Sequence, residues 1–360
     1  MSRPRQGAVI APTSASARVR WWGVDAARGL AVLGMMAAHV LPRHESQGEL
    51  LVDGRPSVLF AVVAGVALGL VTGGPHPHRE SSRSARLQLS IRAALLVGLG
   101  LLLWMLPSGI AIILDYYGVM FLLLIPALFV RRRWLTVTTA VLLFGMPWVR
   151  DAAVDGQLGS VPEAEPWASV RDYLLTGYYP ALLWIPLLTA GLLMARSNLG
   201  STRARVTALL LGLAASLAGY GSAATMTGID ASAHSGTTAE LLGSGGLAVA
   251  IIAGLTIALD RAHTSRVWRA LASPIVAIGR IPLTVYTAHV LIIASLAALG
   301  PAGQFEPAVG VSLFAALTIA AMLVGMLCMK MGWRGPLEVL FSAVSGLPRR
   351  RHSPNPEMRQ

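Results

Sequence analysis

The stretch that decides the fold reads Trp21-Trp22-Gly23-Val24-Asp25-Ala26-Ala27-Arg28-Gly29-Leu30-Ala31-Val32-Leu33-Gly34-Met35-Met36-Ala37-Ala38-His39-Val40. As a helix it is long enough to cross a bilayer, which needs about 20 mostly apolar residues. At about 100° per residue, His39 projects within roughly 20° of Arg28, and Asp25 within roughly 60° of Arg28. Ionisable groups are costly within a bilayer, so three of them on one helical face predict a polar interior site rather than a lipid-facing helix.

The composition of the whole chain is that of an integral membrane protein. Of its 360 residues, 54% are hydrophobic and only 13% are charged, against about 25% charged in soluble proteins. Apolar stretches of suitable length therefore predict an all-α, polytopic helix bundle with about ten transmembrane helices. The predicted segments are 24–41, 56–73, 87–106, 110–130, 134–149, 175–195, 204–222, 240–259, 272–298 and 306–330.

The placement of basic residues predicts the orientation of these segments. With a cytoplasmic N-terminus, 24 of the 29 Lys and Arg residues fall in cytoplasmic turns and tails, as the positive-inside rule requires. An even number of spans with both termini in the cytoplasm gives this pattern. We therefore expect a multi-pass protein of the cytoplasmic membrane.

The distribution of charge argues against a nucleic-acid partner, and the single cysteine needs no partner to explain it. The net charge of +12 is spread in groups of three and four arginines over the predicted cytoplasmic turns. Anionic lipid headgroups explain this distribution, so we expect membrane lipids as partners and no nucleic acid. The single cysteine, Cys328, lies in the last apolar segment and is interpreted as a small core residue.

One membrane domain is predicted over residues 20–340, flanked by two tails. Residues 1–19 and 341–360 are rich in Arg, Ser and Pro, a composition typical of disordered segments. We interpret the first as a disordered cytoplasmic tail and the second as a basic cytoplasmic tail.

Polar side chains gather at the predicted outer ends of the helices. They come from separate regions of the sequence, and loops on a rigid scaffold are common places for sites, so we expect them to converge on a pocket that opens outward. For the aromatic members, the alternative is an interfacial belt of Tyr and Trp. The residues are His39, His44, Asp53, Arg55, Asp115, Tyr116, Tyr117, Tyr178, Tyr179, Trp184, His234 and Ser235.

A second intramembrane histidine, His289, follows Arg280 by nine residues, or about 13 Å along a helix. This depth is near the middle of a bilayer. Pro282 fits the first turn of a helix. His289 is then either a packing residue or part of a polar path through the bundle, where it is a further catalytic candidate.

Several short motifs lie along the chain: Asp25-Ala26-Ala27-Arg28-Gly29 with His39, Gly54-Arg55-Pro56-Ser57 with Gly65, Gly279-Arg280, Leu283-Thr284 with Tyr286 and His289, and Gly335-Pro336-Leu337-Glu338. They resemble the start and the late motifs of the heparan-alpha-glucosaminide N-acetyltransferase-like membrane proteins, in particular their largely uncharacterised bacterial branch. Matching elements run from about residue 21 to 340, so the resemblance covers nearly the whole chain. The opening motif is moderately specific, because other transmembrane acyltransferases share an Arg-Gly followed by a histidine.

The resemblance implies transfer of an acyl group, often acetyl, from cytoplasmic acyl-CoA to a sugar or cell-envelope acceptor on the opposite side of the membrane. It also implies an essential histidine near the non-cytoplasmic face. In lysosomal members of the family that histidine follows the first helix, so His44 competes with His39 for the role.

The residue types suit this chemistry. Attack on a thioester by a hydroxyl or amine needs a base, and imidazole, with its pKa near neutrality, is suitable. His39 is the first choice, with Asp53 or Asp115 as a carboxylate that would fix its tautomer. The developing negative charge on the thioester oxygen needs hydrogen-bond donors. The candidates are Tyr116, Tyr117, Tyr178, Ser235 and Arg55.

Binding of the acyl-CoA donor is expected on the cytoplasmic side, where guanidinium groups would bind its phosphates. Arg28, Arg280, Arg83 and Arg86 are the candidates. For Arg28 the alternative is an ion pair with Asp25 at i, i+3 that only neutralises both residues. The sequence lacks a Gly-rich phosphate loop and Cys/His metal spacing, so we expect acetyl-CoA or another acyl-CoA and no metal.

Two other classes of function fit part of the pattern. A secondary transporter would also line a central path with polar residues, and Leu106-Pro107-Ser108-Gly109 could mark a broken helix. A non-catalytic membrane protein is the third class, but it gives no reason for polar groups at one face. A homodimer is compatible with the sequence.

Overall fold

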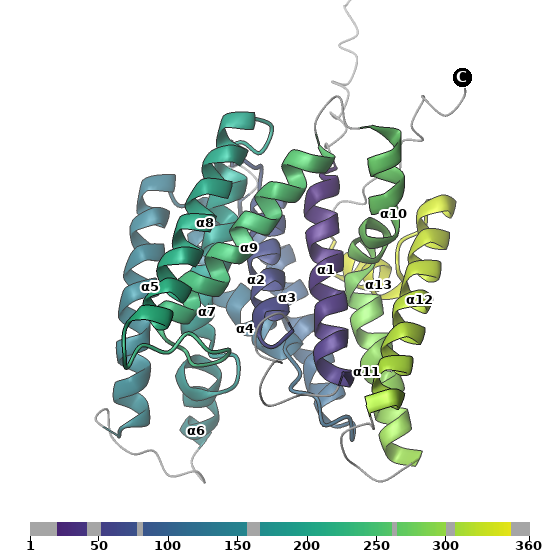
Figure 1. Cartoon of the computed structure of the whole chain (residues 1–360), viewed down its shortest axis with the longest axis horizontal. Helices are drawn as coiled ribbons and strands as arrows, with labels where there is room; N and C mark the ends of the chain where they lie inside the picture. Colours follow the sequence, from purple (N-terminus) through teal and green to yellow (C-terminus); the bar gives the residue numbers. More distant parts are fainter. Residues whose placement is uncertain are drawn as a thin grey trace, which may run out of the picture.

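Helix α1 (Trp22–Val40) lies within the bundle, between α9 on one side and α10, α11 and α12 on the other (Figure 1). The computed structural model describes residues 20–41, 52–77, 82–156, 166–260, 265–299 and 307–346, and these residues contain helices and no strand. The other elements are α2 (Arg55–Val71), α3 (Ser82–Trp104), α4 (Leu114–Leu124), the 3₁₀-helix η1 (Ile125–Phe129), α5 (Arg132–Val154), α6 (Pro166–Arg171), the π-helix η2 (Asp172–Thr176), α7 (Ala181–Arg196), α8 (Thr202–Thr225), α9 (Thr238–Leu259), α10 (Arg266–Arg280), α11 (Pro282–Leu299), α12 (Pro307–Met331) and α13 (Pro336–Val344).

The prediction of an all-α, multi-pass membrane bundle is confirmed. Among the described residues, six helices are long and apolar enough to cross a membrane, and a bent pair, 167–176 with 181–196, makes a seventh if it is one span. These six are α3, α5, α8, α9, α11 and α12. The predicted number of about ten spans stays a prediction, because α1 carries three ionisable side chains and α2 and α4 have only 17 and 11 residues.

The segment predicted as one span over 272–298 is two helices, which corrects the prediction. The chain breaks at Ile281, whose φ of −128° and ψ of 43° are not helical. Pro282 opens α11, as predicted, and cannot donate a backbone hydrogen bond. The side chain of Glu338 accepts hydrogen bonds from the backbone nitrogens of Leu283 and Thr284 at 2.8 and 3.2 Å, and so caps the new helix.

Small residues let α1 approach its neighbours closely. A methyl group at Gly29 would overlap the carbonyl oxygen of Ile275 in α10, and one at Gly279 would overlap the carbonyl oxygen of Asp25. Close approach through small residues is typical of helices packed in membranes. The position of α10 against α1 therefore depends on both glycines.

The bundle has two polar ends, which we name by their residues. The arginine end contains Asp25, Arg28 and Arg280, and the histidine end contains His39 and Arg55. Helix α1 connects them, because Asp25 lies in its first turn and His39 in its last. The arginine end corresponds to the side for which the sequence predicts a cytoplasmic location.

Candidate functional site

The two intramembrane histidines form a pair at the histidine end. Nδ1 of His39 lies 2.9 Å from Nε2 of His289, although the residues are 250 positions apart in the chain. The rings are stacked, with centroids 5.2 Å apart and an angle of 12° between their planes. His289 is 2% exposed, whereas His39 is partly exposed. The first and eleventh helices therefore build one site.

The hydrogen bonds of this pair assign a proton to each neutral ring. Nδ1 of His289 lies 3.4 Å from the carbonyl oxygen of Val285, which can only accept, so this nitrogen carries the hydrogen. Nε2 of His289 is then the acceptor for the Nδ1 hydrogen of His39. This arrangement leaves the lone pair of neutral His39 on its Nε2 atom. We use the name histidine relay for this series of hydrogen bonds, which runs from His39 through His289 to the Val285 carbonyl.

A histidine occupies the place that the sequence analysis gave to a carboxylate. Within the described part of the chain, neither Asp53 nor Asp115 bonds to His39. The Asp115 carboxylate instead accepts a hydrogen bond from Tyr173 at 2.5 Å, and its other oxygen is buried without a partner in the described residues. The backbone carbonyl of Asp53 accepts from the Arg55 nitrogen at 2.7 Å. His44 lies outside the described residues.

One tyrosine contacts the histidine relay, and two of the tyrosines predicted as substrate ligands have structural partners instead. The Tyr286 ring contacts the His289 ring edge-on, with centroids 5.1 Å apart. The Tyr117 hydroxyl donates to the carbonyl oxygen of Ser57 at 2.9 Å, so this predicted substrate ligand joins α4 to α2. Tyr116 packs on Tyr173 with ring centroids 4.6 Å apart. Of the four tyrosines in these contacts, Tyr286 is the one whose ring contacts a histidine of the relay.

Several predicted substrate ligands form a separate aromatic cluster, which we define as Tyr178, Tyr179, Trp184 and His234. The ring centroids of Tyr178 and His234 are 4.1 Å apart, and those of Tyr179 and Trp184 are 5.2 Å apart. Burial raises the pKa of Tyr179, in the turn before α7, well above its usual value, so its hydroxyl stays protonated. Members of the cluster line a small pocket. The structure thus brings these four residues together, in a cluster separate from the histidine relay.

The loop beside the aromatic cluster is held by the carboxylate of Glu240, which the sequence analysis did not single out. Glu240 accepts hydrogen bonds from the backbone nitrogens of His234 and Gly236, both at 2.7 Å. It also accepts from the Ser235 hydroxyl at 3.3 Å. Ser235, predicted as an oxyanion donor, is thus committed to holding its own loop.

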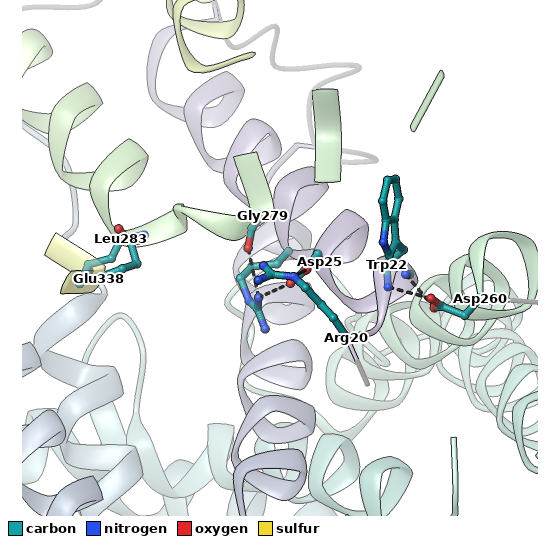
Figure 2. Close-up of polar contacts among 9 residues, drawn as sticks. Arg20, Trp22, Asp25, Asp260, Gly279, Leu283 and Glu338 are labelled. Atoms are coloured by element: carbon teal, nitrogen blue, oxygen red, sulfur yellow. Dashed lines mark hydrogen bonds and ion pairs between the residues drawn. The ribbon is translucent and has the colours of Figure 1, made fainter. Parts of the chain in front are cut away.

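At the arginine end, Arg20, Asp25 and Arg28 form a closed set of paired charges. Asp25, which is 5% exposed, accepts from Arg20 at 2.5 Å and from Arg28 at 2.9 Å. Arg28 also donates to the carbonyl oxygen of Gly279 at 3.1 Å. Figure 2 shows these groups beside the first turn of α1. The ion pair that was the alternative interpretation of Arg28 is therefore present.

A second carboxylate at this end caps α1. Asp260 accepts from the backbone nitrogens of Trp22 and Gly23 at 2.7 and 2.8 Å (Figure 2). Burial raises the pKa of Asp260 above its usual 3.8, and the two hydrogen bonds oppose that shift. The Asp260 side chain thus joins the end of α9 to the start of α1, where the helix N-terminus favours a negative charge.

The structure divides the predicted donor ligands. Arg280 adjoins the closed set, and its Nε atom is buried without a hydrogen-bond partner in the described residues. Arg86 instead lies over the Phe129 ring at 5.5 Å, and Arg83 is exposed near the start of α3. Arg92, which the sequence analysis did not single out, lies within electrostatic range of Arg28 and Glu338. Because Arg83, Arg86 and Arg92 all lie in α3, only their tertiary contacts show which of them lies near the arginine end.

The described residues contain no cluster of three His, Cys, Asp or Glu side chains that could hold a metal ion. Residues 187–346 match a family described as "Protein of unknown function (DUF418)". The match begins in α7 and ends after α13, so it includes Arg280 and His289 but not Arg28 or His39. No curated protein matches the chain. Over this C-terminal part, the chain is similar to a family whose description gives no activity, and the comparisons do not support the more specific acetyltransferase resemblance.

Proposed function

We propose that this protein transfers an acyl group from cytoplasmic acyl-CoA to a hydroxyl or amine of a sugar or cell-envelope acceptor at the opposite face of the membrane. The observation that carries the proposal is the histidine relay. It gives neutral His39 a lone pair on Nε2, on a partly exposed ring in the last turn of α1. The resemblance of the first helix to transmembrane acyltransferases supports the same reaction.

The relay suits a general base. As the acceptor oxygen or nitrogen bonds to the thioester carbonyl carbon, its proton passes to Nε2 of His39, and the bond from carbon to sulfur then breaks. The departing thiolate takes up that proton and leaves as the CoA thiol. The positive charge on His39 in between is stabilised by its Nδ1 hydrogen bond to His289. Protons and electrons therefore balance without a further reactant.

The donor site is proposed at the arginine end. Arg28 and His39 are eleven residues apart on one helix, or about 16 Å along its axis, so an extended thioester arm could run beside α1 from one end to the other. Arg28 is neutralised by Asp25, which makes Arg280 and Arg92 the better phosphate ligands. Arg28 would then position α10 through the Gly279 carbonyl.

The test is an assay of the purified full-length protein in neutral detergent with radiolabelled acetyl-CoA. We expect release of CoA thiol, or transfer of label to added glycans, and its loss by about 10²-fold or more in His39→Ala. His76→Ala is the matched control, because His76 is exposed in the turn after α2. Equal rates in the two variants would reject His39 as the base, and no release by any form would reject the function.

A second pair of variants tests the relay itself. In His289→Gln the amide oxygen can still accept the Nδ1 hydrogen of His39, whereas in His289→Leu no acceptor remains. We expect the Gln variant to keep more activity than the Leu variant, and only the Leu variant to change the pH dependence of kcat/KM. Equal activity and equal pH profiles would show that His289 is a packing residue.

A further inference from the structure

Arg55, the first residue of α2, lies at the histidine end and has no anionic partner among the residues that the structure describes. Its Nε atom donates to the Tyr220 hydroxyl at 2.9 Å, and its guanidinium carbon lies 5.2 Å from the centre of that ring. The Tyr220 hydroxyl is held in turn by Ser244 at 2.8 Å. Nη1 of Arg55 is buried and has no hydrogen-bond partner in the described residues.

Three other arginines of the bundle have more hydrogen-bond partners than Arg55. Arg28 bonds to a carboxylate and a carbonyl, and Arg205 bonds to the carbonyl oxygens of Leu199 and Thr256. Arg196, which is 7% exposed, bonds to carbonyl oxygens of three residues and to a threonine hydroxyl. Arg55 has one neutral partner and no ion pair among the described residues.

A guanidinium held in this way is suited to an anion. Removing a charge from water is expensive unless a counter-charge and hydrogen bonds replace the water. Tyr220 fixes the Nε side of the group, so the side with the Nη atoms is left for two parallel hydrogen bonds, the geometry that phosphate and carboxylate oxygens accept. Arg55 is also the first residue of a helix, where the backbone dipole favours negative charge.

The position of Arg55 connects it to the proposed reaction. Pro56 packs against Gly34 of α1, five residues before His39, and Gly54 lies against the side chain of His234 in the aromatic cluster. The residues on either side of Arg55 thus contact α1 and the aromatic cluster, and its guanidinium contacts Tyr220 of α8. A group bound to Arg55 would be placed at the acceptor side of the site.

We infer that Arg55 binds a phosphate group, as a monoester or diester, carried by the acceptor. The statement that the acceptor carries the phosphate rests on the proposed function. The anion site at Arg55 does not depend on that function. The same chemistry has two sources, a soluble phosphorylated sugar or a lipid whose headgroup contains the phosphate.

The test measures thermal unfolding of the full-length protein in neutral detergent, with inorganic phosphate against chloride at equal ionic strength. Because a ligand that binds only the folded state raises its stability, we expect phosphate to raise the wild-type midpoint by a few degrees. The shift should be absent in Arg55→Gln and reduced in Arg55→Lys, which keeps the charge without the planar fork. Arg133→Gln is the control, since Arg133 is exposed near the start of α5, away from the pocket. No phosphate effect on the wild type, or an equal effect in Arg55→Gln, overturns the inference.

A second arm identifies the source of the phosphate. Phosphatidylglycerol in mixed micelles, compared with diacylglycerol, which has no phosphate, should abolish the Arg55-dependent shift if a lipid headgroup occupies the site, and should leave it unchanged if the ligand is soluble. Acetyl-CoA turnover is measured on the same samples. Turnover without a phosphate shift rejects only the anion site, whereas a phosphate shift without turnover rejects only the proposed transferase.

Discussion

The two polar ends of the bundle differ in how far their charged groups are satisfied. At the arginine end, Asp25 pairs with two arginines, and Asp260 and Glu338 each accept two backbone N–H groups. At the histidine end, neutral rings contact one another and Arg55 keeps unused donors. Buried polar groups that are fully paired stabilise a fold, whereas buried groups with spare capacity are suited to binding or catalysis. The comparison predicts that substitutions of the paired carboxylates at the first end mainly reduce stability and that substitutions at the second end mainly reduce activity.

The largest loss of stability is expected for Asp25→Asn. This change leaves Arg20 and Arg28 without their shared carboxylate at a buried position, and breaking a buried ion pair costs about 3–5 kcal/mol. We expect a strongly lowered midpoint in thermal unfolding of the purified protein, or loss of the folded fraction on size exclusion. Asp151→Asn is the control, because the Asp151 side chain is 64% exposed. Similar midpoints for the two variants would contradict the comparison.

Glu338→Gln should have the next largest effect. The amide keeps one acceptor but loses the charge that favours the N-terminus of α11, so we expect a loss of about 1–2 kcal/mol. Hydrogen exchange should report faster amide exchange at Leu283 and Thr284, the residues whose N–H groups Glu338 accepts. Unchanged protection at both amides would show that the cap is not needed.

His39→Asn should cost less than about 1 kcal/mol of stability, because the ring is partly exposed and its hydrogen-bond partner His289 keeps the Val285 carbonyl. Thermal unfolding and acetyl-CoA turnover measured together separate the two properties. A large fall in the midpoint would place His39 with the structural groups of the arginine end and remove the contrast.

The smallest effect on stability is expected for Asp260→Asn, and this effect changes with pH. Because burial raises the pKa of Asp260 above 3.8, the folded protein takes up a proton there more readily than the unfolded chain. The wild type should therefore gain stability relative to the variant as the pH falls from neutral towards that value, by a few tenths of a kcal/mol. Unfolding midpoints of both proteins at several pH values test this, and a difference that does not change with pH would contradict it.

Part of this architecture could be predicted from the sequence because it is local. The spacing of Asp25 and Arg28 was enough to raise the ion pair as an alternative, and long apolar segments indicated the helices. The pairing of His39 with His289 could not be predicted, because it joins positions 250 residues apart. The break at Ile281 was missed for a related reason, since the cap on α11 comes from Glu338 in the distant α13.

The position of Glu338 has a consequence for how the protein should be handled. The start of the helix that carries His289 is fastened from α13, close to the end of the described chain. Shortening the C-terminus before Pro336, or attaching a bulky fusion partner directly to α13, would disturb an imidazole less than two turns along α11 from the capped residues. Tags for purification are therefore better placed after a spacer beyond residue 346.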